Sequence, residues 1–441
     1  MCPHSHRSPG TSGRTGALFT RTGSEHVLDQ NTYLEQPVTR SVIVNPRRRA
    51  LLAATALAAV GALTLSACGG DADAKGDKQG DSAAKGADIT ISSKDGATDA
   101  SINATGVKVK GGKLTSVKMT SVTSGTAVEG TISGDGTSWK PKSQLERGTK
   151  YKVTANAKDA KGNAATENAT FSTVSSANSF IGTYTPDGGA TVGVGMPVSF
   201  NFDKAITEKK DVQSHITVTS SSGQKVVGHW FGNQRLDFRP EDYWKAGSKV
   251  TMKINLDGVK GANGATGVQN KTVTFTVGRA QVSTVDVGAK KMTVERDGKV
   301  IKSVPISAGS PSNPTYNGKM VISEKFTQTR MNGDTVGFGG EYDIKDVPHA
   351  MRLSSSGTFI HGNYWGSPSI FGSANTSHGC VGLQDARGAG DPNTQGAWFF
   401  NNSLIGDVVT VKGSPDKTVA PDNGLNGWNM SWSEWTAGSA S

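Results

Sequence analysis

Short segments in which apolar and polar residues alternate recur along most of the chain. Glycine-rich turns separate these segments. Strict alternation places every second side chain on the same face of an extended strand, so each segment predicts a strand with one buried face. A first set lies at 89–91, 107–109, 117–119 and 151–155, and a second set at 198–202, 216–218, 250–254 and 273–277.

The two sets of predicted strands repeat along the chain. Three residue pairs recur with a spacing of 99 residues: Pro141 and Pro240, Gly148 and Gly247, and Lys150 and Lys249. A period near 100 residues with frequent turns is typical of tandem β-sandwiches. The segments 88–176 and 177–278 resemble bacterial Ig-like wall modules. They lack the Cys…Trp…Cys pattern, which excludes the disulfide-bonded antibody type.

A third β-rich unit is expected at 279–413, followed by a C-terminal extension at 414–441. Asp297-Gly298 lies between two alternating runs and predicts a tight hairpin. The extension contains three large apolar side chains, which we expect to dock on the body of the protein: Trp428, Trp432 and Trp435. Further elements of the unit are predicted strands at 282–287, 291–296, 299–306, 320–322, 351–353, 358–361 and 408–411, and a short helix at 395–400.

The N-terminal region has the pattern of an export signal. Arg47, Arg48 and Arg49 precede an apolar run at 50–65, and small residues lead to Cys68. The run of 16 residues is short for a transmembrane helix and resembles a bacterial lipoprotein signal, in which Cys68 would carry lipid.

The segment 68–87 is polar and of low complexity, so we expect a flexible tether between residues 1–67, an upstream extension with the signal, and the first module. The alternative interpretation of the apolar run at 50–65 is an N-terminal core helix. Translation could start at Val42 or Val44, and Sec and twin-arginine export both remain open.

Length and composition narrow the class of protein. The 441 residues exceed the size of one domain core, and 56 glycines with 34% hydrophobic residues suit β modules and linkers. The net charge is +10, and without residues 1–67 there remain 40 basic and 34 acidic residues, a charge of +6. This charge fits an anionic wall or membrane surface. The lysines are dispersed without interleaved aromatics, so we expect no nucleic-acid binding.

Cysteine usage directs attention to one position. Cys2 lies before the signal and Cys68 would be lipidated, which leaves Cys380 as the remaining thiol of the mature chain. A lone thiol is either a small core residue or a nucleophile. A thiol with a pKa near about 8.5 needs an imidazole to become a thiolate at neutral pH. His361 ends a predicted strand 19 residues before Cys380, and His378 lies two residues before it.

The spacing His361-x15-Ser377-His378-Gly379-Cys380 resembles the signature of the L,D-transpeptidase (YkuD-type) catalytic domain. The resemblance covers about residues 279–412. The lipobox, the two Ig-like modules and the tryptophan-rich tail resemble the actinobacterial members. The fold class is therefore mainly β: two tandem Ig-like β-sandwiches followed by a YkuD-type catalytic domain with a C-terminal extension.

The family resemblance implies roles for individual residues. Cys380 would be the acylated nucleophile and His361 its base, with the Gly362 carbonyl orienting the imidazole. His378 would shape the site, and N–H groups around Gly379 and Cys380 would hold the oxyanion. The remaining expected substrate-binding residues are Ser377 and Gly379 of the motif, Tyr342 as a lid residue, and Trp365 as a pocket aromatic. Gly382 departs from the family, which has Arg or Asn there, so the missing contact would come from Asn375 or Gln384.

The same resemblance implies a reaction. Cys380 would attack the third residue of a tetrapeptide stem, release D-alanine and pass the acyl group to a neighbouring stem, giving a 3→3 peptidoglycan cross-link. Donor and acceptor stem peptides would be the partners, and carbapenem-type compounds the expected inhibitors. A lipid anchor would hold the protein on the outer face of the cytoplasmic membrane.

Rival interpretations stay open at this point. Water as acceptor would make an L,D-carboxypeptidase, and a non-catalytic lipoprotein would only bind wall polymer. Zinc binding by His361, His378 and Cys380 lacks a fourth ligand, so we expect neither a metal nor a cofactor. His215, His229 and His349 carry no motif and are interpreted as structural or solvated.

Overall fold

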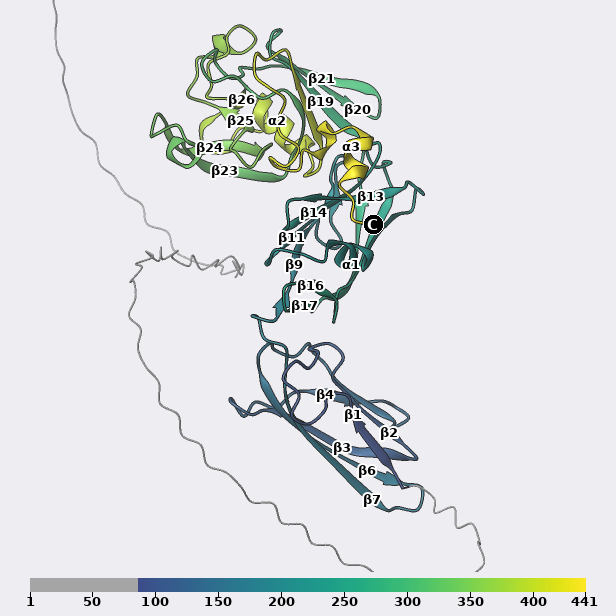
Figure 1. Cartoon of the computed structure of the whole chain (residues 1–441). Coiled ribbons are helices and arrows are strands. Elements are labelled where there is room, and N and C mark those ends of the chain that lie inside the picture. Colours follow the sequence, from purple (N-terminus) through teal and green to yellow (C-terminus); the bar gives the residue numbers. More distant parts are fainter. Residues whose placement is uncertain (1–85) are drawn as a thin grey trace, which may run out of the picture. The chain divides into compact units, whose positions relative to one another are not determined.

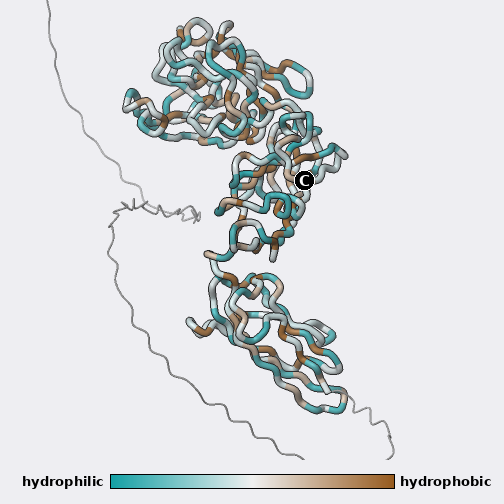
Figure 2. The backbone as a smooth tube through the Cα atoms, viewed as in Figure 1, coloured by the Kyte–Doolittle hydropathy of each residue, from teal (hydrophilic) through white to brown (hydrophobic). Residues whose placement is uncertain are grey.

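The structure is a computed structural model that describes residues 86–441 (Figure 1). The predicted signal segment and the predicted lipidation site at Cys68 lie outside the described residues. Within the described part, no helix is long and apolar enough to cross a membrane. Hydrophilic and hydrophobic residues are interspersed along the backbone of all three units (Figure 2).

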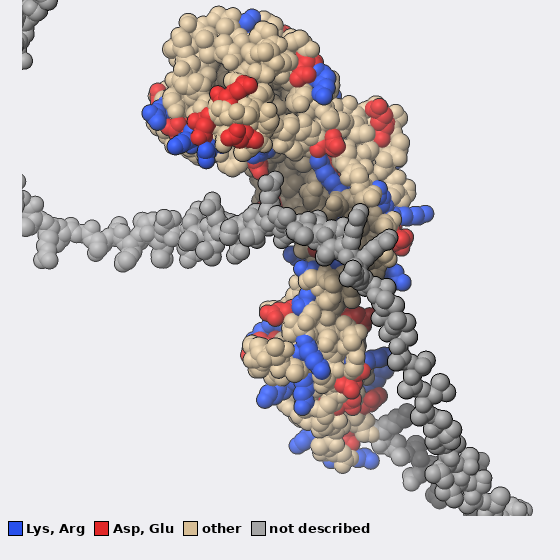
Figure 3. Space-filling view, turned by 60° about the vertical axis from the view of Figure 1, so that its left-hand side comes forward, with Lys and Arg blue, Asp and Glu red and all other residues tan. Residues whose placement is uncertain are grey.

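The first module is a sandwich of two sheets with strand orders β1-β2-β5-β4 and β3-β6-β7. Its core lies between the sheets and contains Trp139, Tyr151 and Phe171, each less than 5% exposed. Basic and acidic side chains are interspersed on the face of this module seen in Figure 3. The strands are β1 (Asp88–Ile91), β2 (Val107–Lys110), β3 (Gly112–Ser121), β4 (Gly130–Ile132), β5 (Ser138–Pro141), β6 (Lys150–Asp159) and β7 (Ala164–Ser172).

The second module contains two four-stranded sheets, β10-β18-β15-β12 and β13-β14-β11-β9, and a small third sheet, β16-β17-β8. Its core holds several aromatic rings, among them Phe200, Phe275 and Trp244. The elements are β8 (Ser179–Phe180), β9 (Gly182–Thr185), β10 (Thr191–Val192), β11 (Val198–Phe202), α1 (Lys209–Ser214), β12 (Ile216–Ser220), β13 (Val226–Phe231), β14 (Arg235–Pro240), β15 (Lys249–Asn255), β16 (Lys260–Ala262), β17 (Ala265–Gly267) and β18 (Asn270–Val277).

The repeat of 99 residues corresponds to one structural feature in both modules. Pro141 and Pro240 end β5 and β14, and β6 and β15 each begin at the repeated lysine. Between them, Gly148 and Gly247 have φ of +64° and +77°, the left-handed region that favours glycine. The repeated residues therefore build the same turn between equivalent strands.

The third unit has two sheets, β21-β20-β19-β27-β22 and β23-β24-β25-β26. Helix α2 contributes Phe399 to the shared core. The elements are β19 (Gln281–Asp286), β20 (Lys291–Arg296), β21 (Lys299–Pro305), β22 (Gly318–Val321), β23 (Glu324–Asn332), η1 (Gly333–Val336), β24 (Asp343–Arg352), β25 (Phe359–Asn363), η2 (Pro368–Ile370), β26 (Val381–Gln384), η3 (Arg387–Ala389), α2 (Gln395–Asn402) and β27 (Val408–Lys412).

The hairpin predicted at Asp297-Gly298 is confirmed. Arg296 pairs with Lys299, which leaves two loop residues. Both have positive φ, +50° at Asp297 and +77° at Gly298. These values are those of a type I′ turn, whose twist matches the flanking strands.

The C-terminal extension consists of η4 (Gly427–Asn429) and α3 (Trp432–Ala437) and packs back onto the protein, as predicted for its tryptophans. The Trp428 indole is 6% exposed and donates to the Gly195 carbonyl at 2.7 Å. The Trp435 indole is fully buried and donates to the Val227 carbonyl at 2.9 Å. Both acceptors belong to the second module. Val419, just after β27, is buried in the core of the third unit, so the extension contacts both.

Candidate active site

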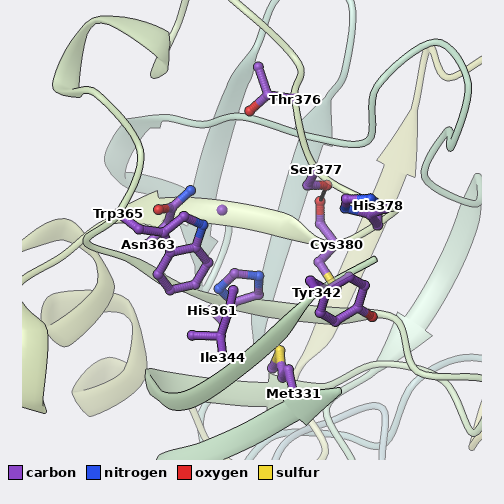
Figure 4. A pocket seen from close by; sticks show the side chains of 11 residues that line it. Met331, Tyr342, Ile344, His361, Asn363, Trp365, Thr376, Ser377, His378 and Cys380 are labelled. Carbon is purple, nitrogen blue, oxygen red and sulfur yellow. Dashed lines mark hydrogen bonds between the residues drawn. The ribbon is translucent and has the colours of Figure 1, made fainter. Parts of the chain in front are cut away.

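Two parallel strands bring the predicted nucleophile and base together. His361 lies in β25, and β26 begins at the residue after Cys380. The register pairs His361 with Gly382. Of the 18 residues between His361 and Cys380, those after Asn363 lie outside the two strands and return the chain to the same sheet edge. His361 and Cys380 line one cavity of about 170 Å³ (Figure 4). Its lining is Met331, Tyr342, Ile344, His361, Asn363, Trp365, Thr376, Ser377, His378, Cys380 and Gly382.

The imidazole of His361 is held in one tautomer. Its Nδ1–H donates to the Gly362 carbonyl oxygen at 2.8 Å, which leaves Nε2 as the unprotonated nitrogen. The residue is 5% exposed, and this burial lowers its pKa below the usual value, while the charge of Asp385 acts in the opposite direction. A neutral imidazole with a free Nε2 can accept a proton.

The Cys380 thiol is partly exposed to the cavity but poorly solvated. This desolvation raises the pKa of the thiol to about 11. Its Sγ donates to the Gly357 carbonyl oxygen at 3.7 Å. Within the described residues, no hydrogen bond joins Sγ to His361. The resting site therefore holds a neutral thiol and a neutral imidazole, and a thiolate must be formed by proton transfer.

The Ser377–Cys380 turn is closed by its own serine. Ser377 Oγ donates to the Cys380 carbonyl oxygen at 2.6 Å and accepts from the Gly379 amide at 3.2 Å. Gly379 has φ of +108°, a conformation that requires glycine. Of the two amides expected around the oxyanion, at Gly379 and Cys380, the Gly379 N–H therefore already has an acceptor in Ser377 Oγ.

Tyr342 and His378 cover one side of the cavity. Their ring centroids are 5.0 Å apart, and Phe338 packs on His378 at 5.4 Å. His378 Nε2–H donates to Glu341 Oε2 at 2.9 Å. Burial raises the pKa of the Tyr342 hydroxyl to about 12, so the phenol stays protonated. The segment between β23 and β24 thus contacts the cysteine motif through His378.

Trp365 forms the opposite wall of the cavity. Its ring lies nearly parallel to that of His361, with an interplanar angle of 17° and a centroid separation of 5.7 Å. The side chain is 43% exposed, unusual for so large an apolar group. It covers the His361 imidazole and remains partly exposed to solvent at the mouth of the cavity.

Neither Asn375 nor Gln384, which were the expected replacements for the missing side chain at Gly382, lines the cavity. Asn375 is used structurally, because its amide bonds the backbone of Ala308 at 3.0 Å and does not line the cavity. Gln384 is exposed on β26 and does not line the cavity either. Asn363 does, and a Cβ at Gly382 would lie 3.6 Å from its Nδ2. Sequence could have found Asn363, since it follows His361 by two residues on the same strand face.

Met331 and Ile344 also line the cavity, and no pattern in the sequence predicts this. Met331 and Ile344 are cross-strand partners in β23 and β24, and strand pairing alone brings them to the site. Within residues 86–441 no group of three or more His, Cys, Asp or Glu residues is placed to hold a metal ion.

Comparison with known families agrees with this architecture. The L,D-transpeptidase catalytic domain family matches residues 280–411, and the bacterial Ig domain family matches residues 97–260. The second match extends across both sandwiches.

Characterised relatives share most of the chain. L,D-transpeptidase 2 of Mycobacterium tuberculosis is 33% identical over 80% of this chain and 85% of its own length. L,D-transpeptidase 5 of the same species is 29% identical over 72% of this chain and 69% of its length.

Among solved structures, an L,D-transpeptidase in complex with imipenem is 27% identical, covers 53% of this chain and 99% of its own, and has a TM-score of 0.45. An L,D-transpeptidase from Mycobacterium smegmatis is 25% identical over 53% of this chain and 99% of its own, with a TM-score of 0.41. On the extent and identity of the match to L,D-transpeptidase 2, the chain belongs to the L,D-transpeptidase family.

Proposed function

We propose that this chain is a peptidoglycan L,D-transpeptidase that forms 3→3 cross-links through a thioester on Cys380. One observation carries the proposal: a single cavity contains the Cys380 thiol and a buried His361 whose Nδ1–H is fixed by Gly362, leaving Nε2 free. A neutral base beside a thiol is the arrangement needed to make a nucleophile on demand.

The proposed first half-reaction makes the acyl-enzyme. His361 Nε2 takes the thiol proton as Sγ bonds to the carbonyl carbon of the third stem residue. The C–N bond to the terminal D-alanine then breaks, and the leaving amine takes the proton from His361. The products are the thioester and free D-alanine, with the imidazole again neutral.

The second half-reaction transfers the acyl group. An amine of a neighbouring stem attacks the thioester carbon and gives its proton to His361, and the C–S bond breaks. The sulfur recovers the proton from the imidazole, which restores the resting site and leaves an amide cross-link. Water in place of the amine would give the carboxypeptidase product.

The surrounding residues support this chemistry in distinct ways. The amide of Cys380 is the proposed oxyanion donor, because the Gly379 amide is bound to Ser377 in the resting site. Tyr342, held against His378, would close over the donor peptide, and the exposed face of Trp365 would contact substrate at the mouth. Asn363 beside Gly382 offers an amide for the peptide backbone.

The proposed location follows from the N-terminal pattern. Lipid on Cys68 would hold the protein on the outer face of the cytoplasmic membrane, and the polar segment after it would let the modules reach the wall. Donor and acceptor stem peptides are the proposed partners.

Mass spectrometry of the intact protein with a carbapenem tests the nucleophile. The wild type should gain the mass of one inhibitor, and Cys380→Ala should gain none. Analysis of the products from a defined tetrapeptide donor then separates cross-linking from trimming, since a dimer requires an amine acceptor and a tripeptide requires only water. Absence of any adduct on the wild type would contradict the proposed nucleophile and favour a non-catalytic protein that binds wall polymer.

A further inference from the structure

A buried carboxylate that the proposed mechanism does not use lies behind the base. Asp385 directly follows β26, five residues after Cys380, and its side chain is fully buried. Its Oδ2 accepts from His349 Nδ1–H at 2.8 Å. Its Oδ1 accepts from Thr394 Oγ1 at 2.7 Å and from the Ala386 amide at 2.8 Å. Both carboxylate oxygens are therefore satisfied without solvent.

Two glycines make the space that this carboxylate occupies. A Cβ at Gly362 would lie 2.0 Å from Asp385 Oδ2, and a Cβ at Gly396 would lie 2.1 Å from the same oxygen. Neither position can carry a side chain while Asp385 stays in place. Gly362 is also the residue whose carbonyl accepts from His361 Nδ1–H. The carboxylate thus packs against the same residue that orients the base.

His349 is fixed on the other side of the carboxylate. It has φ of +48°, a left-handed conformation that is uncommon for a residue with a side chain. Its ring is buried and packs on Phe400 with a centroid separation of 5.1 Å. Such a conformation persists where the surroundings determine it, and functional sites are frequent places for it.

We propose that Asp385 and His349 form a positioning pair for His361, an inference that rests on the proposed function of His361 as base. The pair fixes the Gly362 carbonyl and places a negative charge behind the imidazole. The tautomer with Nδ1–H is thereby held, and the imidazolium formed during proton transfer is stabilised. In serine hydrolases a carboxylate bonded directly to the catalytic histidine performs this role, whereas Asp385 would act through Gly362, against which it packs.

The charges around His361 set the expected direction of the effect. Burial lowers the pKa of His361, and the Asp385 charge raises it. Removing that charge should lower the pKa further, so the base becomes weaker and the acidic limb of the pH profile moves to lower pH. The titratable groups facing His361 from the adjoining segments are Cys380, Tyr342, His378 with Glu341, and Asp385 with His349.

The decisive variant is Asp385→Asn, which keeps the shape and removes the charge. We expect acylation at neutral pH to slow about tenfold or more, which is less than the about 10² to 10⁴ lost with the base itself, because Asp385→Asn leaves His361 in place. The acidic limb of kcat/KM should move to lower pH. The matched control is Asp407→Asn, because Asp407 is also buried and pairs with Arg279 at 2.8 Å without lining the cavity. Asp407→Asn should lower the stability of the fold and leave the acidic limb of the kcat/KM profile at the same pH as in the wild type.

A second variant keeps the test decisive if Asp385→Asn folds poorly. His349→Asn tolerates positive φ and leaves the charge of Asp385, so acylation should slow while the limb does not move to lower pH. Disappearance of the limb in His349→Asn would mean that His349 itself titrates and would overturn the proposal. The proposal would also be overturned if Asp385→Asn lowered kcat/KM at every pH without moving the pH at which kcat/KM falls on the acidic side. A purely structural role of Asp385 predicts that result.

NMR titration of the His361 imidazole separates this inference from the proposed function. The tautomer and pKa of the ring can be measured in the resting full chain without substrate. A wild type that forms no thioester refutes the proposed function alone. A His361 pKa that is equal in wild type and Asp385→Asn refutes the positioning pair alone.

Discussion

Truncating Trp435 to alanine should detach the C-terminal extension from the second module. The indole is fully buried, stacks on His229 with a centroid separation of 4.9 Å and donates to Val227. The Arg239 guanidinium lies 4.3 Å from its ring centroid. His229 in turn donates to the Trp435 carbonyl at 2.9 Å. The side chain is the centre of the docking contact.

The expected loss of stability follows from the burial. A buried indole removes roughly 200 Å² of surface from water, which corresponds to about 5 kcal/mol at ~25 cal/mol per Å². Partial relaxation around the cavity offsets some of this, so the free energy of unfolding should fall by about 3–5 kcal/mol. For a cooperative unit of 150–250 residues this lowers Tm by roughly 6–20 °C.

The detached extension should also disturb the nucleophile. Asn426 bonds the Leu353 carbonyl at 3.0 Å, and Asn423 accepts from the Ser356 amide at 2.9 Å. These contacts hold the turn that ends at Gly357, whose carbonyl accepts from the Cys380 thiol. Carbapenem acylation should therefore slow together with the fall in Tm.

Differential scanning calorimetry and stopped-flow acylation of the full chain measure both effects. Trp432→Ala is the matched control, since Trp432 lies on the same helix but is only half-buried, and Arg239 is 5.5 Å from its ring. Trp432→Ala should lower the free energy of unfolding by less than half as much as Trp435→Ala does. A Trp435→Ala protein with a Tm within about 2 °C of the wild type and unchanged acylation would show that the docking of Trp435 supports neither the fold nor the site.

The remaining predictions concern the site and the anchor. His361→Ala should slow acylation by about 10² to 10⁴, and an unchanged rate in stopped-flow would assign the base role elsewhere. Because burial lowers the pKa of His361 below 6.5, kcat/KM in the wild type should stay flat through neutral pH and fall only at acidic pH as the base takes up a proton. The same depressed pKa stabilises the fold above pH 6.5, and this stability should be lost as the pH falls, which urea titrations at several pH values measure. Gly362→Ala should lower both Tm and acylation, because its Cβ would overlap Asp385; a fully active protein would contradict the packing. Cys68→Ala should move the protein from the membrane to the soluble fraction without changing its activity on soluble donors, as fractionation and immunoblotting would report.

Sequence predicted the elements that local chemistry determines. Asp297-Gly298 specifies a type I′ turn by itself, and the alternation at 250–254 and 273–277 fixes strands that pair in the structure. The sequence pattern placed His361 and Cys380 in one site, and both line the cavity because β25 holds His361 and the paired β26 begins directly after Cys380. Local pattern and tertiary structure agree at these places.

Contacts that depend on how distant strands pair could not be predicted from the sequence. Strand β26 has four residues including a glycine, too short a run to stand out from a loop. His349 and Asp385 are 36 residues apart and meet only because β24, β25 and β26 share a sheet. The engagement of the Gly379 amide by Ser377 depends on a side-chain rotamer, which spacing does not specify.

In the proposed mechanism, Cys380 carries the acyl group during transfer between stem peptides. Incubating the wild-type chain with a tetrapeptide donor and no acceptor, followed by quenching and peptide mapping by mass spectrometry, tests it directly. We expect a tripeptide linked to Cys380 and release of D-alanine, and conversion of that adduct into a 3→3 dimer when an acceptor stem is added. A dimer formed without any adduct on Cys380, or formed equally well by Cys380→Ala, would contradict it.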